Sequence, residues 1–296
     1  MRWGWSLPLL LVLPFPAFPA DDTSKQDQAS KTTDPEIPQH RLLNDTFRLR
    51  LGTYYAQTTT EANFTTQNGG AGVDVNFEDL LGVGSRKWVG EAAMYWRMTE
   101  HWRVDFDYFS INRGATRTLA RDVTWGDFSY SAGTEVNSTT KISDLRAVVG
   151  YSFFKRADKE LGAGLGLHMT GFAANINATA SGSVSGGGGS VSASGGGASS
   201  ESVSAPLPVA SVYGDFALTD TWALSLRTDW LSMNYDKYSG AIRATAVDFV
   251  YQPFTHFAFG FGVHSLTLAL DVHYSNSQTQ VRFVSHGPVA FVAYSY

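Results

Sequence analysis

Along most of this chain, apolar and polar side chains alternate with a period of two residues. In the stretch "HWRVDFDYF" (101–109), one face is apolar and the other carries charges. The alternation recurs in "FRLRLGTY" (47–54), "SDLRAVVGYSFF" (143–154), "ELGAGLGLHM" (160–169) and "TWALSLRTDW" (221–230). Because successive side chains of a β-strand point to opposite faces, this period predicts strands. Helical periodicity is nearly absent.

The N-terminus has the outline of a secretory signal peptide. Residues 1–20, "MRWGWSLPLLLVLPFPAFPA", place one Arg before a short apolar stretch and a Pro-rich run. A membrane-spanning helix needs about 20 apolar residues, so this segment is too short and too rich in proline to be an anchor. Residues 21–43 are polar and are predicted to form a flexible exported leader. No later apolar run has spanning length, so the chain is either soluble or a transmembrane barrel.

Tryptophan spacing favours the barrel over a soluble β-sandwich, whose strands also alternate. Trp88 and Trp96 lie eight residues apart on one face, as do Trp222 and Trp230. Eight residues of a tilted strand cover roughly 20 Å, which is close to the apolar band between the two aromatic girdles of a membrane barrel. Trp102 completes the predicted girdle set.

Connections alternate between short and long, as in an antiparallel up-and-down barrel. We therefore predict an all-β transmembrane barrel over 44–296, with both termini in the periplasm. The predicted strands are ten: 46–57, 87–98, 101–113, 138–154, 160–176, 206–218, 221–233, 240–251, 257–272 and 281–296. Eight or twelve remain alternatives, because "DVTWGDFSYSAGTEV" (122–136) could extend a strand pair or add one. Alternation changes parity near 264–265, which predicts a β-bulge there. A second slip is expected near 287–288.

Charged residues of both signs fall on the faces predicted to line the lumen. They are Arg48, Arg50, Glu91, Arg97, Arg103, Asp105, Asp107, Asp144, Arg146, Arg227 and Asp229. A barrel of eight to ten strands is just wide enough for side chains to fill it, and buried charges must be paired. A salt-bridged, closed lumen is therefore favoured over a conducting pore.

Composition excludes several kinds of site. The chain has no Cys, so neither a disulfide nor a thiolate metal site can form. Lys+Arg number 22 against 27 Asp+Glu, which offers no basic face for nucleic acid. The seven His have no ligand spacing, so we expect no metal and no cofactor.

The last residues, "FVAYSY", end in a lipid-facing row of Val292, Tyr294 and Tyr296. A terminal aromatic residue after alternating apolar residues resembles the C-terminal signal of outer-membrane barrels. It implies the outer membrane of a Gram-negative bacterium and contact with the barrel assembly machinery. Outer-membrane lipids or lipopolysaccharide are then the expected partners, and we expect a monomer.

Two connections have distinctive sequences. Residues 178–205 are rich in Gly and Ser and are predicted to form a flexible, solvated outer loop. A loop that covers the pore or contacts lipopolysaccharide is the alternative. In "DVNFEDLLG" (74–82), residues 78–81 could form a helical turn on or in the barrel mouth.

A four-residue stretch, "HYSN" (273–276), is similar to the His-x-Ser-Asn signature of the lipid A 3-O-deacylases. The resemblance would make His273 a base and Ser275 a nucleophile. A Ser–His pair needs an orienting acid or amide, and no Asp or Glu follows Asp271. The stretch also falls at a predicted hairpin tip, so we expect no enzyme here.

Most of 44–296 resembles a group of uncharacterised proteobacterial outer-membrane barrel proteins within the OmpA-like and opacity-like class. The stretches that carry this resemblance are "DVNFEDLLG", "HWRVDFDYFSINRGATRTL", "VTWGDFSYSAGTEV", "APLPV", "FALTDTW" and "HGPVAFVAYSY". The resemblance implies a signal peptide and a barrel but no reaction. The leading hypothesis is a non-enzymatic barrel with a structural or surface-interaction role. A narrow porin-like channel, or a binder of small or lipidic molecules, is the alternative.

Overall fold

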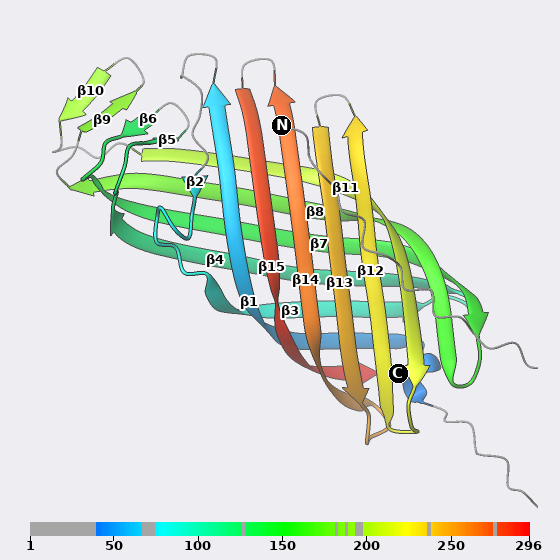
Figure 1. Ribbon diagram of the computed structural model, residues 1–296. Coiled ribbons are helices and arrows are strands. Elements are labelled where there is room, and N and C mark those ends of the chain that lie inside the picture. The colour runs from blue at the N-terminus through cyan, green and yellow to red at the C-terminus, as the bar shows by residue number, and fades with distance from the viewer. Residues whose placement is uncertain are drawn as a thin grey trace, which may run out of the picture. The chain divides into compact units, whose positions relative to one another are not determined.

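The computed structural model describes residues 40–66, 75–125, 128–180, 183–186, 189–192, 198–235, 238–274 and 277–296. Within these ranges ten long strands form one antiparallel sheet, in which each strand pairs with the next (Figure 1). The last strand pairs with the first and closes the ring. These strands are β1 (Phe47–Thr66), β3 (Arg86–Arg97), β4 (Trp102–Thr118), β7 (Glu135–Lys155), β8 (Lys159–Ala180), β11 (Ala198–Ala217), β12 (Trp222–Tyr235), β13 (Tyr238–Tyr251), β14 (Phe257–Tyr274) and β15 (Ser277–Ser295). The predicted up-and-down barrel of ten strands is confirmed.

The first strand begins and the last strand ends at one rim. The short turns at 98–101, 156–158, 218–221 and 252–256 lie at the same rim. We call this rim the terminal end and the opposite rim the loop end. Tyr296 closes the terminal end, because its carbonyl accepts hydrogen bonds from the amides of Thr46 and Phe47 at 2.9 Å. Among the described residues, no helix has the length and apolar character needed to cross a membrane.

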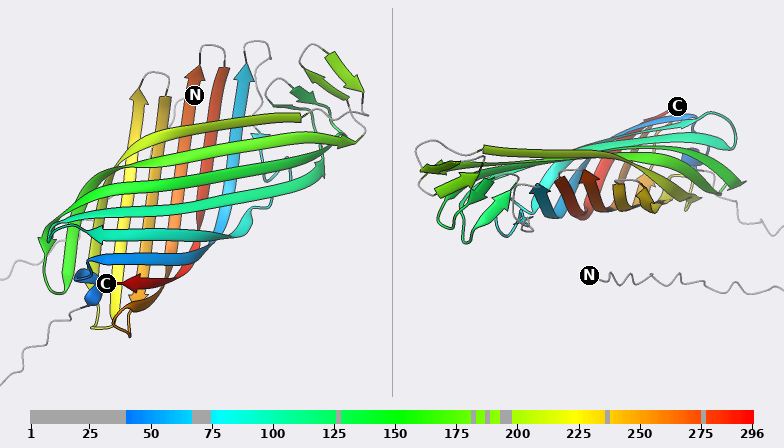
Figure 2. Two further views of the ribbon diagram at one scale, coloured as in Figure 1. Left: turned by 180° about the vertical axis from the view of Figure 1, so that it is seen from behind. Right: turned by 90° about the horizontal axis from the view of Figure 1, so that it is seen from above.

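Shorter elements lie at the two ends. The 3-10 helix η1 (Arg41–Leu43) precedes β1, and β2 (Val75–Asn76) pairs with β1 near the loop end. A second, four-stranded sheet contains β5 (Val123–Trp125), β6 (Phe128–Tyr130), β9 (Ser183–Gly186) and β10 (Gly189–Ser192). It lies to one side of the loop end (Figure 2). In its described residues the segment 122–136 adds no barrel strand. It supplies β5 and β6 to this outer sheet, and Glu135 and Val136 extend barrel strand β7.

The predicted Gly/Ser loop at 178–205 is shorter than expected. Strand β8 continues to Ala180, β11 begins at Ala198, and the two strands pair up to Asn177 and Ala198. Strands β9 and β10 form a hairpin between them. The composition alone indicated flexibility, whereas pairing with neighbouring strands extends the sheet into this segment.

Along β14 the apolar residues move from the outer face to the inner face without any bulge. Phe257, Phe259, Phe261 and Val263 are about half exposed on the outside, whereas Leu266, Leu268 and Leu270 are buried inside. The ladders from β14 to β13 and β15 keep one register throughout, so the predicted bulge at 264–265 is wrong. The environment changes instead: the outer face meets lipid in the terminal half, and the inner face forms an apolar core in the loop half.

The slip expected near 287–288 is also wrong. Tyr54 pairs with Val289 and Gln57 pairs with His286, which is the same register on both sides. A Cβ at Gly287 would lie 2.0 Å from the Tyr55 carbonyl oxygen. Glycine permits this close approach of the two strands, and inward and outward positions alternate unbroken to the C-terminus.

One row of paired residues marks where the lipid-facing band ends. Val247 pairs with Val263, and Tyr55 pairs with Trp88, all of them on the outer face. The next row of outward-facing residues, two positions nearer the loop end on each strand, is polar. Its members, which pair across neighbouring strands, are Thr245, Ser265, His286, Gln57 and Arg86. The apolar outer positions below this row cover about the 9–11 residues that a barrel strand needs to cross a membrane. The longer strands therefore extend beyond the bilayer at the loop end.

Candidate functional site in the barrel lumen

All eleven charged residues singled out from the sequence lie on inward positions, and each is buried or partly buried. The structure also brings them together. The carboxylate of Asp107 on β4 accepts hydrogen bonds from Arg227 at 2.7 Å and from Arg146 at 3.0 Å, and lies 3.5 Å from Arg50. These three arginines stand on β12, β7 and β1. One carboxylate thus joins four strands across the barrel interior.

Two histidines extend this central network, and sequence reasoning missed both. His264 lies 3.1 Å from Glu91 and 3.0 Å from Asp248. His168 lies 2.8 Å from Asp144 and 3.4 Å from Asp229. Their positions in the alternating pattern could have indicated that both face inward. His168, for example, lies between Leu167 and Met169, which are exposed on the outside.

The arginines complete the central network. Arg50 bonds to Glu91 at 2.8 Å and to Asp248 at 2.9 Å, while Arg146 bonds to Asp229 at 2.6 Å. Asp248 was not among the predicted lumen charges, although it holds both Arg50 and His264. Apolar and polar residues alternate less regularly along its strand, β13, than along the neighbouring strands, so the sequence did not single out Asp248.

A second network lies nearer the terminal end. Arg97 bonds to Glu160 at 2.6 Å, and Arg103 bonds to Asp215 at 3.0 Å and to Asp105 at 3.1 Å. The guanidinium groups of Arg48, Arg97 and Arg103 lie 5.2–5.5 Å from the centre of the Tyr95 ring. Arg103 also lies 3.4 Å from the centre of the Tyr213 ring. Glu160, Asp215 and these two tyrosines were missed, because their partners come from distant strands.

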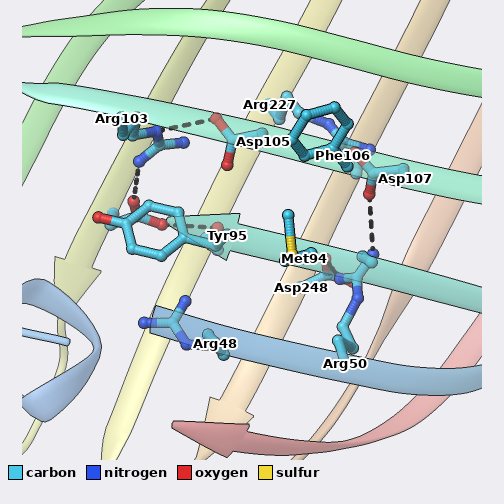
Figure 3. A pocket seen from close by; sticks show the side chains of 14 residues that line it. Arg48, Arg50, Met94, Tyr95, Arg103, Asp105, Phe106, Asp107, Arg227 and Asp248 are labelled. Carbon is cyan, nitrogen blue, oxygen red and sulfur yellow. Dashed lines mark hydrogen bonds and ion pairs between the residues drawn. The ribbon is translucent and has the colours of Figure 1, made fainter. Parts of the chain in front are cut away.

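Two small cavities adjoin these networks in the described part of the chain. The larger, about 90 Å³, is lined by residues of both networks, including Arg48, Arg50, Tyr95, Arg103 and Asp107 (Figure 3). The smaller, about 50 Å³, contains His168 and His264. Such volumes hold a few water molecules. In the described part of the chain, no group of His, Asp and Glu has the arrangement of a metal site.

The terminal end is filled by residues predicted to belong to a loose leader. His40 and Leu43 are fully buried, and Leu42 packs against inward apolar residues such as Val250 and Phe291. Arg48 donates to the Leu42 carbonyl at 2.8 Å. Burial lowers the pKa of His40, although a backbone hydrogen bond with Thr221 opposes this. Residues 40–43 are therefore an ordered part of the barrel, while 1–39 lie outside the described residues.

The loop end is filled by the segment 75–83, which enters the mouth. Phe77 and Leu81 are fully buried in the apolar core of the loop half, and the Leu80 amide donates to the Asn76 carbonyl at 3.0 Å, as in a helical turn. Phe77 meets Phe172 edge to face with ring centres 5.9 Å apart. The interpretation of this stretch as a turn in the mouth agrees with the geometry.

The other predicted residues lie on the outer surface. Trp88, Trp96, Trp102 and Trp230 are exposed, and Trp222 is partly exposed and stacks on Tyr251. Val292, Tyr294 and Tyr296 form an exposed outward row at the terminal end. His273 is exposed at the loop end, with Nδ1 3.4 Å from Asp271. Ser275 lies outside the described residues.

No family model matches this sequence. No curated protein matches it either. Among solved structures, the chain is similar to the outer membrane protease OmpT from Escherichia coli, with a TM-score of 0.52 and 12% identity over 84% of this chain and 96% of that chain. OprG from Pseudomonas aeruginosa matches with a TM-score of 0.33 and 10% identity over 88% and 99% of the two chains. Ail from Yersinia pestis matches with a TM-score of 0.28 and 9% identity over 82% and 98%. At such identities the likeness to OmpT concerns the fold alone, and that fold is the up-and-down barrel of outer-membrane proteins.

Proposed function

We propose that this chain is a closed barrel of the Gram-negative outer membrane with a structural and surface-interaction role. The terminal end would face the periplasm, as short turns do in bacterial barrels, and the loop end would face outward. The observation that carries this proposal is that the lumen is filled at three levels. Each level is made by different side chains, so the loss of one leaves two in place.

The three fillings are different in kind. At the terminal end, Leu42 and Leu43 close the lumen with apolar side chains. In the middle, ion pairs centred on Asp107 join opposite walls. At the loop end, the segment 75–83 packs into an apolar core. A hydrated path for ions would have to displace all three.

Planar-bilayer conductance of the refolded chain tests the closed lumen. We expect no stepwise currents from the wild type. A variant with residues 40–43 removed, 76–82 replaced by a short Gly–Ser linker and Arg146→Ala should conduct, which shows that insertion is measurable. Stepwise currents from the wild type would favour the alternative of a narrow channel.

The surface role is supported by the polar row above the lipid-facing band. Arg86 and Arg243 are exposed on the outer face of β3 and β13. Arg86 lies one outward step from Trp88, and Arg243 pairs directly across from Trp230. Guanidinium groups beside an aromatic girdle suit phosphate-bearing lipid head groups. We expect these arginines to bind such lipids in the outer leaflet.

Native mass spectrometry of protein released from mixed-lipid vesicles tests this contact. The wild type should retain phosphate-bearing lipid in preference to neutral lipid. Changing both arginines to Ala together should remove the preference. The matched control is Arg156→Ala, which removes an exposed charge from the opposite end. Equal retention by all three proteins would refute the contact.

We also propose that the barrel is not an enzyme. The acid that the sequence seemed to lack beside His273 is Asp271, two residues earlier on the same strand face. The side chain of Asp271 also accepts from Gln278 and Gln280, at 3.1 and 3.0 Å, and the His273 side chain is 57% exposed. An exposed, solvated pair activates a hydroxyl poorly. Lipid A from cells with the wild type, His273→Ala or Ser275→Ala should have identical masses. Loss of an acyl chain with the wild type alone would assign a deacylase.

A further inference from the structure

Each of the two lumen histidines contacts a carboxylate with each of its ring nitrogens. In His264, Nδ1 lies 3.1 Å from Glu91 Oε2 and Nε2 lies 3.0 Å from Asp248 Oδ1. In His168, Nδ1 lies 2.8 Å from Asp144 Oδ2 and Nε2 lies 3.4 Å from Asp229 Oδ2. A neutral imidazole has a single N–H and would turn one lone pair toward a carboxylate. With the four carboxylates ionised, all four contacts are hydrogen bonds only when both rings carry two protons.

The charge balance of the central network gives the same answer independently. Five carboxylates are connected through shared ion pairs: Glu91, Asp107, Asp144, Asp229 and Asp248. The arginines in this network are three, namely Arg50, Arg146 and Arg227. With neutral histidines the buried network carries two uncompensated negative charges, and with two imidazolium rings it is neutral. A net charge in a closed lumen is costly, because little water is present to solvate it.

The groups around the two rings come from six strands. His264 on β14 faces Asp248 on β13, Glu91 on β3, and Tyr54 on β1, whose ring centre lies 6.3 Å away. His168 on β8 faces Asp144 on β7 and Asp229 on β12. Both rings line the smaller cavity together with Asp107, Arg146 and Arg227. The cations that face either ring are already bonded to carboxylates, so they do not supply the missing charge.

We propose that His168 and His264 are proton-binding sites that hold the central level of the lumen closed. Each proton joins two strands through a pair of charged hydrogen bonds: β7 to β12 through His168, and β3 to β13 through His264. The inference rests on the proposed closed barrel and names its regulation. The direction follows from the charge: bound protons stabilise the closed network, and their loss as pH rises leaves two negative charges that repel each other. The central network is therefore closed at neutral pH and loosens in alkali.

Nitrogen-15 NMR of the full, refolded chain with labelled histidines tests the protonation directly. A free imidazole loses its proton near pH ~6.5. At about pH 7.5 we expect two of the seven His to show both ring nitrogens protonated. His168→Gln and His264→Gln should each remove one of these signals. His273→Gln, at an exposed position, serves as the control and should leave both signals in place. Two neutral lumen rings at this pH would overturn the inference.

Two variants that differ in net charge distinguish the effect of the His168 proton on stability from the effect of its side-chain packing. His168→Gln removes one positive charge, so the barrel should unfold at a lower temperature. The measurement is the temperature at which half of the protein has changed from its folded to its unfolded electrophoretic mobility. His168→Gln combined with Asp144→Asn restores a neutral network, so most of that loss should be recovered at neutral pH. If the double variant is no more stable than the single one, His168 serves only to fill space, and the inference fails.

Bilayer recordings distinguish this inference from the proposed function on which it rests. The wild type should be closed at every pH, because its two apolar fillings do not depend on these protons. The variant with residues 40–43 removed and 76–82 replaced retains only the central network, so it should be closed at neutral pH and conduct on alkaline titration. Currents from the wild type at neutral pH refute the closed barrel, whatever the NMR shows. If this variant stays closed in alkali while the histidine signals lose their second proton, the regulation alone is refuted.

Discussion

The guanidinium of Arg113 donates a hydrogen bond to the carboxylate of Glu78 inside the loop end of the barrel, at 2.5 Å. Arg113 stands on β4 and is 5% exposed, while Glu78 belongs to the segment 75–83 that enters the mouth. The other Glu78 oxygen accepts from the Thr60 amide at 2.8 Å. One side chain thus fixes the inserted segment to two strands of the wall.

Glu78→Gln should loosen this segment. The change keeps the side-chain shape but leaves the buried Arg113 without its charge partner, which costs about 3–5 kcal/mol in comparable buried pairs. We expect faster hydrogen exchange over 75–83. Asp79→Asn is the matched control, since it removes the same charge from the exposed neighbouring residue. Equal exchange in the two variants would show that apolar packing alone holds the segment.

Leu268→Ala and Thr267→Ala should differ sharply although the residues are adjacent. Leu268 is 1% exposed in the apolar core of the loop half, and Thr267 faces outward. Truncating a buried Leu costs about 2–5 kcal/mol, whereas an exposed Thr contributes little. The midpoint of heat-modified mobility should fall only for Leu268→Ala. A similar fall for both would mean that lipid reaches this level of the barrel.

The two ends of the Gly/Ser segment should respond differently to deletion. Removing 181–197 leaves β8 and β11 paired, so the barrel should fold with nearly wild-type stability, because loop length changes stability only weakly. Removing 181–204 also deletes the start of β11 and Val203, which is buried in the core. We expect lower folded yield for the longer deletion alone. Loss of folding with the shorter deletion would show that β9 and β10 are required.

Tyr296→Asp should lower the amount of protein in the membrane. The residue belongs to the outward row with Val292 and Tyr294, and its backbone joins β15 to β1. A carboxylate placed in this row is costly beside lipid. Tyr296→Phe keeps the aromatic ring and should insert normally. Membrane yield and heat-modified mobility measure the difference, and normal values for the Asp variant would exclude a role of this row in assembly.

Acid should release the segment that closes the terminal end. The pKa of His40 is lowered by burial, so the docked segment binds fewer protons than the released one. The contribution of His40 to docking is therefore complete above the ordinary pKa of ~6.5 and is lost as pH falls below it. The chain has no Cys, so Leu42→Cys provides a single label site. Maleimide labelling should rise in acid, and adding His40→Gln should abolish that dependence.

The sequence alone predicted the number of long strands, their order and the faces of most of them. These follow from a local rule, because alternate side chains of a strand point in opposite directions wherever the strand lies. The inward placement of Asp107 and Arg146 and the outward placement of Trp88 and Trp230 required nothing more. The partners of Asp107 required closure of the ring, since Arg50, Arg146 and Arg227 approach it from strands far apart in the chain.

Only the tertiary structure decided what the apolar faces meet. In β14 the exposed Phe259 and the buried Leu268 lie on opposite faces, which from the sequence indicated a bulge. The register shows a change of surroundings instead, from lipid outside to an apolar core inside. A side chain such as Leu loses water equally well against lipid or against protein, so its hydrophobicity cannot say which one covers it. Only the tertiary structure showed that residues 40–43 and 75–83 close the two ends. Both segments fit the space inside the closed ring, and strands far apart in the chain determine the shape of that space.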